Sequence, residues 1–445
     1  MILSSLECLK AQQPLTANQS SSECMSIFMD SLKRSKHPAL GTSDQFEKWL
    51  QQKIQENKNT SFNKKEETVY TIPVIVHVIH NGEAIGTGSN ISDDQIQSQI
   101  NTLTANFRKQ SSILNKLSKP PFDVTNWSTM AVDCGVQFCL AEKDTNGNTL
   151  STAGIERLDR NVLGFSAPPY SVTSFYIENT IKPVTIWNPN KYLNLWVVNL
   201  SGNILGYSTF PQQSTLLGLD KGGLLSSPTS DGVVMHYKNF GTVGNLNTGF
   251  ITGAICTHEV GHWLGLKHLW GDISNSCNGT DYCDDTPAQK SASASNNTFP
   301  KISCNNGPWG NMYVNFMDYG LDSLLTMFTD NQKTRVRIVL ENSPMRVSLV
   351  AQTTSCSVAT KIDENQKTHI SIYPNPSAGH ITITLNHQEV VSIKVIDALG
   401  KVVEKIENIS ADQMEVNIER SGLFFIQVNT PSTSIIEKVI VETEK

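Results

Sequence analysis

The first 110 residues change from a polar, helical pattern to a β-type pattern. Residues 20–66 are polar and rich in Lys and Gln, with helical spacing over 43–57. Residues 69–80 form a long β-branched run, which predicts a buried strand. Ser92 then begins an S-x-x-Q capping box, after which apolar residues recur at helical spacing. The pattern predicts a polar N-terminal region and then a domain that opens with a strand and a helix.

The middle of the chain continues this mixture of strand and helix patterns. Residues 201–231 are rich in Gly, Ser and Pro, which predicts long loops. We therefore expect an α/β domain over residues 67–356. Its further predicted elements are strands over 135–141, 192–199 and 232–236, and a helix over 252–264.

The end of the chain has a different pattern. Residues 357–368 are polar without apolar periodicity and predict a linker. Residues 369–445 contain short strands at a spacing of roughly ten residues, separated by turn signals. This spacing predicts a small all-β sandwich. The chain thus divides into an N-terminal region (1–66), an α/β domain (67–356), the linker and the β-sandwich.

Composition excludes several classes of protein. Only 17% of the 445 residues are charged, and the formal net charge is −6. This mild acidity has the wrong sign for a nucleic-acid-binding protein. No apolar run is long enough to predict a transmembrane span. The first residues lack a basic region and an unbroken apolar run, so a signal peptide is not clearly present.

One short stretch carries the chemistry. Residues 258–268 read HEVGHWLGLKH, with histidines at His258, His262 and His268. A helix places the first two imidazoles on one face, because they are four residues apart. On the same helix the third would lie about 15 Å further along the axis, so the chain must turn sharply. Gly265 is where that turn can occur, since glycine tolerates a positive φ.

Three neutral imidazoles leave tetrahedral Zn²⁺ one open position for water. Zinc lowers the pKa of that water, and Glu259 is placed to act as general base. The motif therefore predicts hydrolysis of peptide bonds by metal-activated water. The competing interpretation, an amphipathic helix with chance histidines, requires five fixed positions to match by accident.

Downstream, residues 315–320 read NFMDYG. Together with the histidine motif, this turn resembles the metzincin zinc peptidases, and more closely their pappalysin or ulilysin-like branch. Weaker agreement spans roughly residues 67–355 and implies a mixed twisted sheet with a long zinc-binding helix. By this resemblance, Met317 forms a hydrophobic floor under the zinc, and Tyr319 hydrogen-bonds the tetrahedral intermediate.

The resemblance also implies features around the active site. Asp322 corresponds to an acidic residue that lines the pocket for the residue after the scissile bond, which implies a preference for Arg or Lys. The alternative is a solvated loop aspartate. Family members carry structural calcium in the region that here offers hard oxygen ligands, and the alternative there is an Asx-capped turn. The candidate calcium ligands are Asp281, Asp284, Asp285 and Thr286.

The nine cysteines are an odd number, so at least one thiol is left over if the others pair. By the resemblance, Cys277 and Cys304 match one family disulfide. Family precursors use a propeptide cysteine to block the metal, and we hypothesise that role for Cys24, with Cys8 as a distant second candidate. The remaining pairings stay open: Cys134, Cys139, Cys256, Cys283 and Cys356 are unassigned.

The C-terminal segment resembles the sorting domain of the type IX secretion pathway. The residues that carry this resemblance are the Y-P-N-P-S-x-G stretch from Tyr373 and the G-L-F-x-I-x-V pattern from Gly422. It implies export through the periplasm and outer membrane, with the secretion machinery as partner. A carbohydrate-binding or adhesive sandwich is the rival, which no cluster of Trp or Tyr supports.

We therefore expect a secreted zinc endopeptidase, made as a latent precursor, that acts on protein or peptide substrates. Two alternatives remain open. One is a secreted binding or adhesion protein on an inactive peptidase scaffold, and the other is a zinc amidase acting on a non-protein substrate. An intact Glu259 argues against the first, because a binding scaffold has no need of that carboxylate.

Overall fold

A computed structural model shows two compact units, Met1–Val358 and Ala359–Lys445, each described here by itself. The structure describes residues 23–36, 41–60, 68–110, 125–212, 229–273, 275–293, 300–351, 370–385, 390–397, 401–409, 413–429 and 434–442. The start of the chain, Cys8, Cys356 and the predicted linker lie outside these residues.

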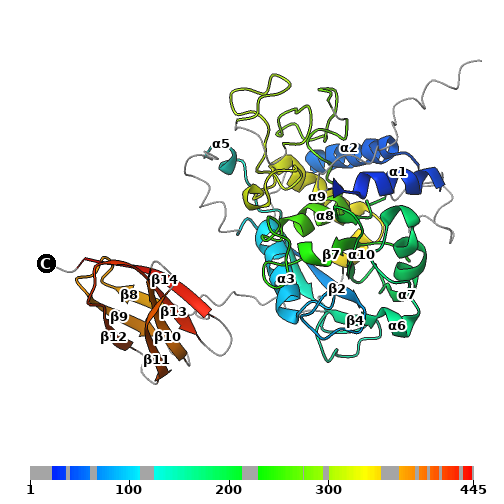
Figure 1. The fold of residues 1–445 in the computed structure, drawn as a ribbon. Helices are drawn as coiled ribbons and strands as arrows, with labels where there is room; N and C mark the ends of the chain where they lie inside the picture. The colour runs from blue at the N-terminus through cyan, green and yellow to red at the C-terminus, as the bar shows by residue number, and fades with distance from the viewer. Residues whose placement is uncertain are drawn as a thin grey trace, which may run out of the picture. The chain divides into compact units, whose positions relative to one another are not determined.

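The first unit is built on one mixed sheet of seven strands (Figure 1). Strand β2 pairs in parallel with β3, β4 and β5, and β7 continues this parallel part beyond β5. Antiparallel β6 follows, and the short β1 pairs with β6 in parallel. The strands are β1 (Glu23–Cys24), β2 (Tyr70–His80), β3 (Val136–Leu140), β4 (Ile155–Asp159), β5 (Leu193–Val198), β6 (Ile204–Ser208) and β7 (Val233–His236).

The predicted buried strand is the centre of this sheet. Val74 and Val76 of β2 belong to the main core, whereas Ile79 belongs to a second core cluster. Both faces of β2 are therefore covered, which explains its unbroken β-branched sequence. The predicted mixed α/β fold is confirmed.

The prediction of long loops over residues 201–231 was wrong for its first part, because β6 lies there. The strand is short and contains Gly206, so it has no alternating apolar pattern. A Cβ at Gly206 would lie 2.8 Å from the Val234 carbonyl oxygen and 3.3 Å from Glu259 Cγ. Gly206, which suggested a loop in the sequence, is thus required because the strand packs closely against the helix that carries Glu259.

Helices cover the sheet and carry the motif. Ser92 caps α3 (Asp93–Phe107) by accepting a hydrogen bond from the Gln95 amide, as its sequence predicts. Helix α8 (Ala254–Trp263) contacts α3, β6 and β7, and α2 (Ser43–Thr60) contacts α9 (Asp330–Asn342). The remaining helices are α1 (Ser26–Lys36), α5 (Thr125–Ser128), α6 (Arg160–Leu163), α7 (Lys182–Thr185) and α10 (Arg346–Val350). Single turns are η2 (Val172–Ser174), η3 (Ile177–Ile181), η4 (Tyr237–Asn239) and η5 (Asp322–Leu324).

The second unit is the predicted β-sandwich. One sheet has the order β12-β9-β8 and the other β11-β10-β13-β14. Ile383 from the first sheet and Ile426 from the second lie in one core. The strands are β8 (Ile370–Tyr373), β9 (His380–Leu385), β10 (Val390–Asp397), β11 (Val402–Ile409), β12 (Gln413–Asn417), β13 (Gly422–Asn429) and β14 (Ser434–Val441).

None of the helices that the structure describes combines the length and apolar composition needed to span a membrane.

Candidate active site

Helix α8 and the turn after it bring three histidines together. His258 and His262 lie one turn apart on α8, which ends at Trp263. Gly265 then adopts φ +88°, and a Cβ there would lie 2.9 Å from Val339 Cγ2. Because this turn reverses the chain, His268 faces the two helical histidines, as the spacing predicts.

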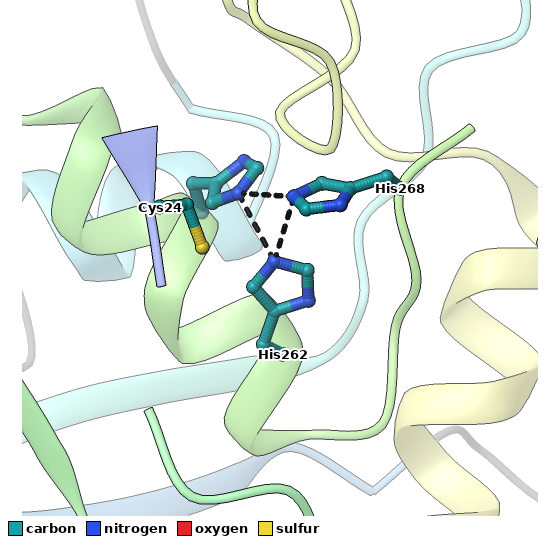
Figure 2. A group of neighbouring side chains, drawn as sticks. Cys24, His262 and His268 are labelled. Atoms are coloured by element: carbon teal, nitrogen blue, oxygen red, sulfur yellow. Dashed lines mark hydrogen bonds between the residues drawn. The ribbon is translucent and has the colours of Figure 1, made fainter. Parts of the chain in front are cut away.

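The three Nε2 atoms form a nearly equilateral triangle with sides of 3.1, 3.1 and 3.2 Å (Figure 2). The Nδ1 atoms of His258 and His262 lie 2.6 and 2.8 Å from the carbonyl oxygens of Phe316 and Leu266. A carbonyl only accepts, so each of these Nδ1 atoms carries the proton and the Nε2 atoms present lone pairs. His268 Nδ1 donates in the same way to Asp272 Oδ1 at 2.5 Å.

Three facing lone pairs repel one another unless a cation lies between them. Zinc holds imidazole nitrogens at about 2.0–2.1 Å, which places tetrahedral ligands about 3.4 Å apart. The observed triangle is close to that size. Burial lowers the pKa of His258 to about 3 and the pKa of His262 well below its ordinary value, with the neighbouring imidazoles adding to the effect. Both rings are therefore neutral, and the site fits a zinc ion.

Cys24 is the fourth member of this group. Its Sγ and the three histidine nitrogens all lie within 4.8 Å of one another. Figure 2 shows the cysteine facing the imidazoles from strand β1. Burial, followed by the charge of Glu259, raises the pKa of this thiol well above its ordinary value. Among the described parts of the chain, this is the one cluster of His, Cys, Asp or Glu side chains suited to a metal.

Glu259 is fully buried beside the cluster. Its Oε2 accepts a hydrogen bond from Ser26 Oγ at 2.7 Å and one from Cys24 Sγ at 3.4 Å. Its Oε1 has no hydrogen-bond partner among the described residues. Burial raises the pKa of Glu259 to about 7, although the bonds from Ser26 and Cys24 oppose the shift.

Met317 and Tyr319 both lie beside the histidine cluster. A Cβ placed on Gly261, in the helix between the two ligands, would be 2.6 Å from Met317 Sδ. The turn that carries Met317 also provides the Phe316 carbonyl for His258. The Tyr319 ring centroid lies 5.6 Å from that of His258 and 4.9 Å from that of His268.

Comparison with solved structures gives the decisive observation. The chain is 36% identical to mature mirolysin of Tannerella forsythia, solved with a cleaved peptide, and covers 97% of that chain and 64% of its own length, with a TM-score of 0.53. A family model described as pregnancy-associated plasma protein-A, peptidase family M43, matches residues 177–341. The chain belongs to the pappalysin family of zinc metallopeptidases.

Further proteins resemble this chain. A Tannerella forsythia promirolysin mutant is 32% identical, with 74% of this chain and 96% of that chain covered and a TM-score of 0.56. An extracellular metalloprotease of Neurospora crassa is 36% identical over 149 residues, 33% of this chain and 47% of that protein. One from Arthroderma benhamiae is 27% identical over 270 residues, covering 60% and 76%. The chain spans about half the length of the first curated relatives it matches.

The C-terminal unit matches a second family model, a secretion system C-terminal sorting domain, over residues 371–442. The predicted sorting domain is therefore confirmed. The pappalysin is a secreted protein, and its β-sandwich carries the signal for export by the type IX pathway.

Asp322 lies outside the zinc cluster of the pappalysin. Its Oδ2 accepts hydrogen bonds from the amides of Ile251 and Thr252, just before α8, at 2.9 and 2.8 Å. It is not a solvated loop residue, because it is only 4% exposed. Its Oδ1 has no hydrogen-bond partner in the described residues, and burial raises the pKa of the carboxyl.

The predicted calcium ligands have protein partners. Asp281 Oδ2 accepts from Thr286 Oγ1 at 2.8 Å, and the Asp285 carboxylate accepts from Thr329 Oγ1 and the Asn331 amide. Asp284 is exposed. These bonds tie the loop to the start of α9, and calcium binding stays a prediction.

The cysteines of the first unit fall into separate groups. Cys277 and Cys304 form the predicted disulfide. Cys139 is disulfide-bonded whereas Cys134 keeps its thiol, so these two do not pair. Cys256 and Cys283 are buried thiols.

The sequence analysis missed two residues of the site. Ser26 reaches Glu259 from 233 positions away, and nothing in the polar N-terminal sequence marks it. Asp272 fixes the His268 ring, and it lies four residues after that histidine. A search for a carboxylate soon after the third ligand would have found Asp272, because zinc-binding histidines commonly donate to a carboxylate.

Proposed function

We propose that this pappalysin is a zinc-dependent endopeptidase that is synthesised as a latent precursor. The observation that carries the proposal is the convergence of three imidazoles beside a buried carboxylate, one oxygen of which has no hydrogen-bond partner among the described residues. Its substrates are proteins or peptides, and the secretion machinery is its partner through the β-sandwich.

His258, His262 and His268 would hold the zinc ion. Zinc bound there supplies a Lewis acid that lowers the pKa of a water molecule and polarises the scissile carbonyl. Glu259 takes the proton of the attacking water on its free oxygen and passes it to the leaving amine. Tyr319 donates a hydrogen bond to the oxyanion from its position beside His258 and His268.

Met317 and the carbonyl of Phe316 keep the first ligand in place. The carbonyl fixes the tautomer and ring orientation of His258, and the methionine fills the space under Gly261. We infer that this turn acts as the floor of the metal site.

Asp322 provides specificity for a basic residue after the scissile bond. Its Oδ2 accepts from two backbone amides, and its Oδ1 is buried without a hydrogen-bond partner among the described residues. A buried carboxylate oxygen of this kind gains a charge-assisted hydrogen bond from an Arg or Lys side chain. We infer that Arg and Lys are the preferred residues.

Latency comes from the N-terminal region. Cys24 lies at the position from which a fourth zinc ligand would exclude water, and Ser26 occupies one oxygen of Glu259. Both residues belong to the segment 1–66 that we infer to be the propeptide. The promirolysin match, which covers 74% of this chain against 64% for mature mirolysin, supports the inference.

Casein cleavage by the processed protein tests the function. We expect cleavage that a chelator abolishes and that added Zn²⁺ restores. Cleavage that continues after complete removal of the metal would contradict the proposed mechanism. A metal-loaded protein that cleaves a non-protein amide but neither casein nor peptides would favour the amidase.

A further inference from the structure

Helix α2 packs on the catalytic part of the chain through an apolar face. Phe46, Trp49, Leu50 and Ile54 share a buried cluster with Ile338 and Val339 of α9. This cluster is separate from the main core around the sheet. Helix α2, which belongs to the inferred propeptide, therefore has its own contact surface on the enzyme.

The same contact surface contains a buried ion pair. Glu47 Oε2 and Oε1 accept from the Nη1 and Nη2 atoms of Arg335, both at 2.9 Å. The two side chains are 3% and 1% exposed. Arg335 Nη2 also donates to the Gly265 carbonyl at 2.9 Å, in the turn that leads to the third histidine. The docked helix is thus connected to the zinc-binding turn through one guanidinium.

A second polar contact joins α2 to the enzyme beside this pair. Lys267 Nζ donates to Ser43 Oγ at 3.2 Å, at the first residue of α2. Asp44 lies in the first turn of α2 and Glu47 in its next. The acidic start of the helix therefore lies near Lys267 and Arg335, and Arg335 also interacts electrostatically with Asp281 of the enzyme.

The contact surface of α2 is distinct from the contacts of Cys24. The cysteine and Ser26 reach the zinc cluster from β1 and the start of α1, whereas α2 contacts α9 and the zinc-binding turn from the side. If the segment is cut, Arg335 loses Glu47, and Ile338 and Val339 lose their apolar cover. A helix that covered Arg335 again without an anion would bury this cation unpaired, which is strongly unfavourable, so the site favours an acidic helix.

We propose that the face of α9 around Arg335, Ile338 and Val339 is a docking site for an acidic amphipathic helix, and that α2 of this chain rebinds there after it is cleaved from the enzyme. The inference rests on the proposed precursor. The released helix would then occupy the processed enzyme independently of the metal site.

Binding of the helix to the processed enzyme tests the proposal. A fluorescent peptide of residues 43–60, which lacks Cys24, is titrated with processed enzyme whose metal site is saturated with a hydroxamate inhibitor. Fluorescence anisotropy reports binding. The variant peptides carry Glu47→Ala or, as the matched control, Glu56→Ala, because Glu56 is an exposed acid on the same helix.

We expect saturable binding that the inhibitor does not displace. Glu47→Ala should weaken it about 100-fold, since Arg335 is left unpaired. Glu56→Ala should change it by no more than about fivefold. Absence of saturable binding, displacement by the inhibitor, or equal losses for the two variants would overturn the proposal. Casein cleavage is measured separately, so an inactive enzyme that still binds the peptide would refute only the peptidase function.

Discussion

Replacing Gly261 by alanine tests how closely helix α8 packs against the turn that carries Met317. The added Cβ would lie 2.6 Å from Met317 Sδ and 3.4 Å from its Cε. Met317 is fully buried, and its backbone amide donates to Asn315 Oδ1 at 2.9 Å, so it has little room to move. The substitution therefore forces the zinc helix and the turn apart.

Two effects of opposite sign decide the magnitude. Alanine is about 1 kcal/mol better than glycine in a helix interior, which would stabilise the protein. Overpacking a filled core costs about 1–3 kcal/mol, and here it exceeds the gain because the contact is with a buried sulfur. We expect a net loss of about 1–2 kcal/mol in the free energy of unfolding.

The assay is urea unfolding followed by tryptophan fluorescence. All 7 tryptophans precede residue 359, so the signal reports on the first unit alone. In a Met317→Ala background the new methyl has space, and Gly261→Ala should become neutral or stabilising by about 1 kcal/mol. The coupling between the two sites should then be about 1–3 kcal/mol. A Gly261→Ala protein more stable than the native protein, with no coupling, would refute the reasoning.

Three further substitutions examine separate parts of the site. Cys24→Ala should speed self-activation of the precursor, because a fourth ligand is removed, and unchanged latency would end the cysteine hypothesis. Asp272→Asn should weaken zinc affinity about 10–100-fold in chelator competition, since it loosens the His268 ring, whereas Asp94→Asn on the exposed face of α3 should not. Asp322→Asn should lower kcat/KM about 10–100-fold for peptides with Arg or Lys after the scissile bond. The ratio of basic to neutral peptides is the measurement for Asp322, because it is insensitive to a general loss of folded protein.

Local sequence patterns predicted the elements whose burial follows a regular pattern along the chain. The run over residues 69–80 became β2 because both faces of that strand are buried. The N-cap at Ser92 and the turn at Gly265 were predictable because each is decided within a few residues. The Gln95 half of the predicted capping box is not formed, because that side chain donates to the carbonyls of Tyr237 and Phe240. The same holds for the histidine motif, because its spacing determines how the three imidazoles can meet.

Contacts between distant residues were not predictable in this way. The bond between Ser26 and Glu259 and the pair between Glu47 and Arg335 join residues 233 and 288 positions apart. No periodicity marks such pairs, because each depends on how whole helices pack. Strand β6 was missed for a related reason, since Gly206 is required by neighbours that only the folded chain brings close.

The measurement that tests the central claim most directly combines metal content and activity in one preparation of Glu259→Ala. The account predicts that the processed variant keeps one zinc ion per chain, because its three histidines are unchanged. It also predicts that casein cleavage falls by about 10²–10⁴-fold, since the general base is lost. A variant that keeps its zinc and still cleaves casein at the native rate would contradict the assigned roles of Glu259 and the histidine cluster.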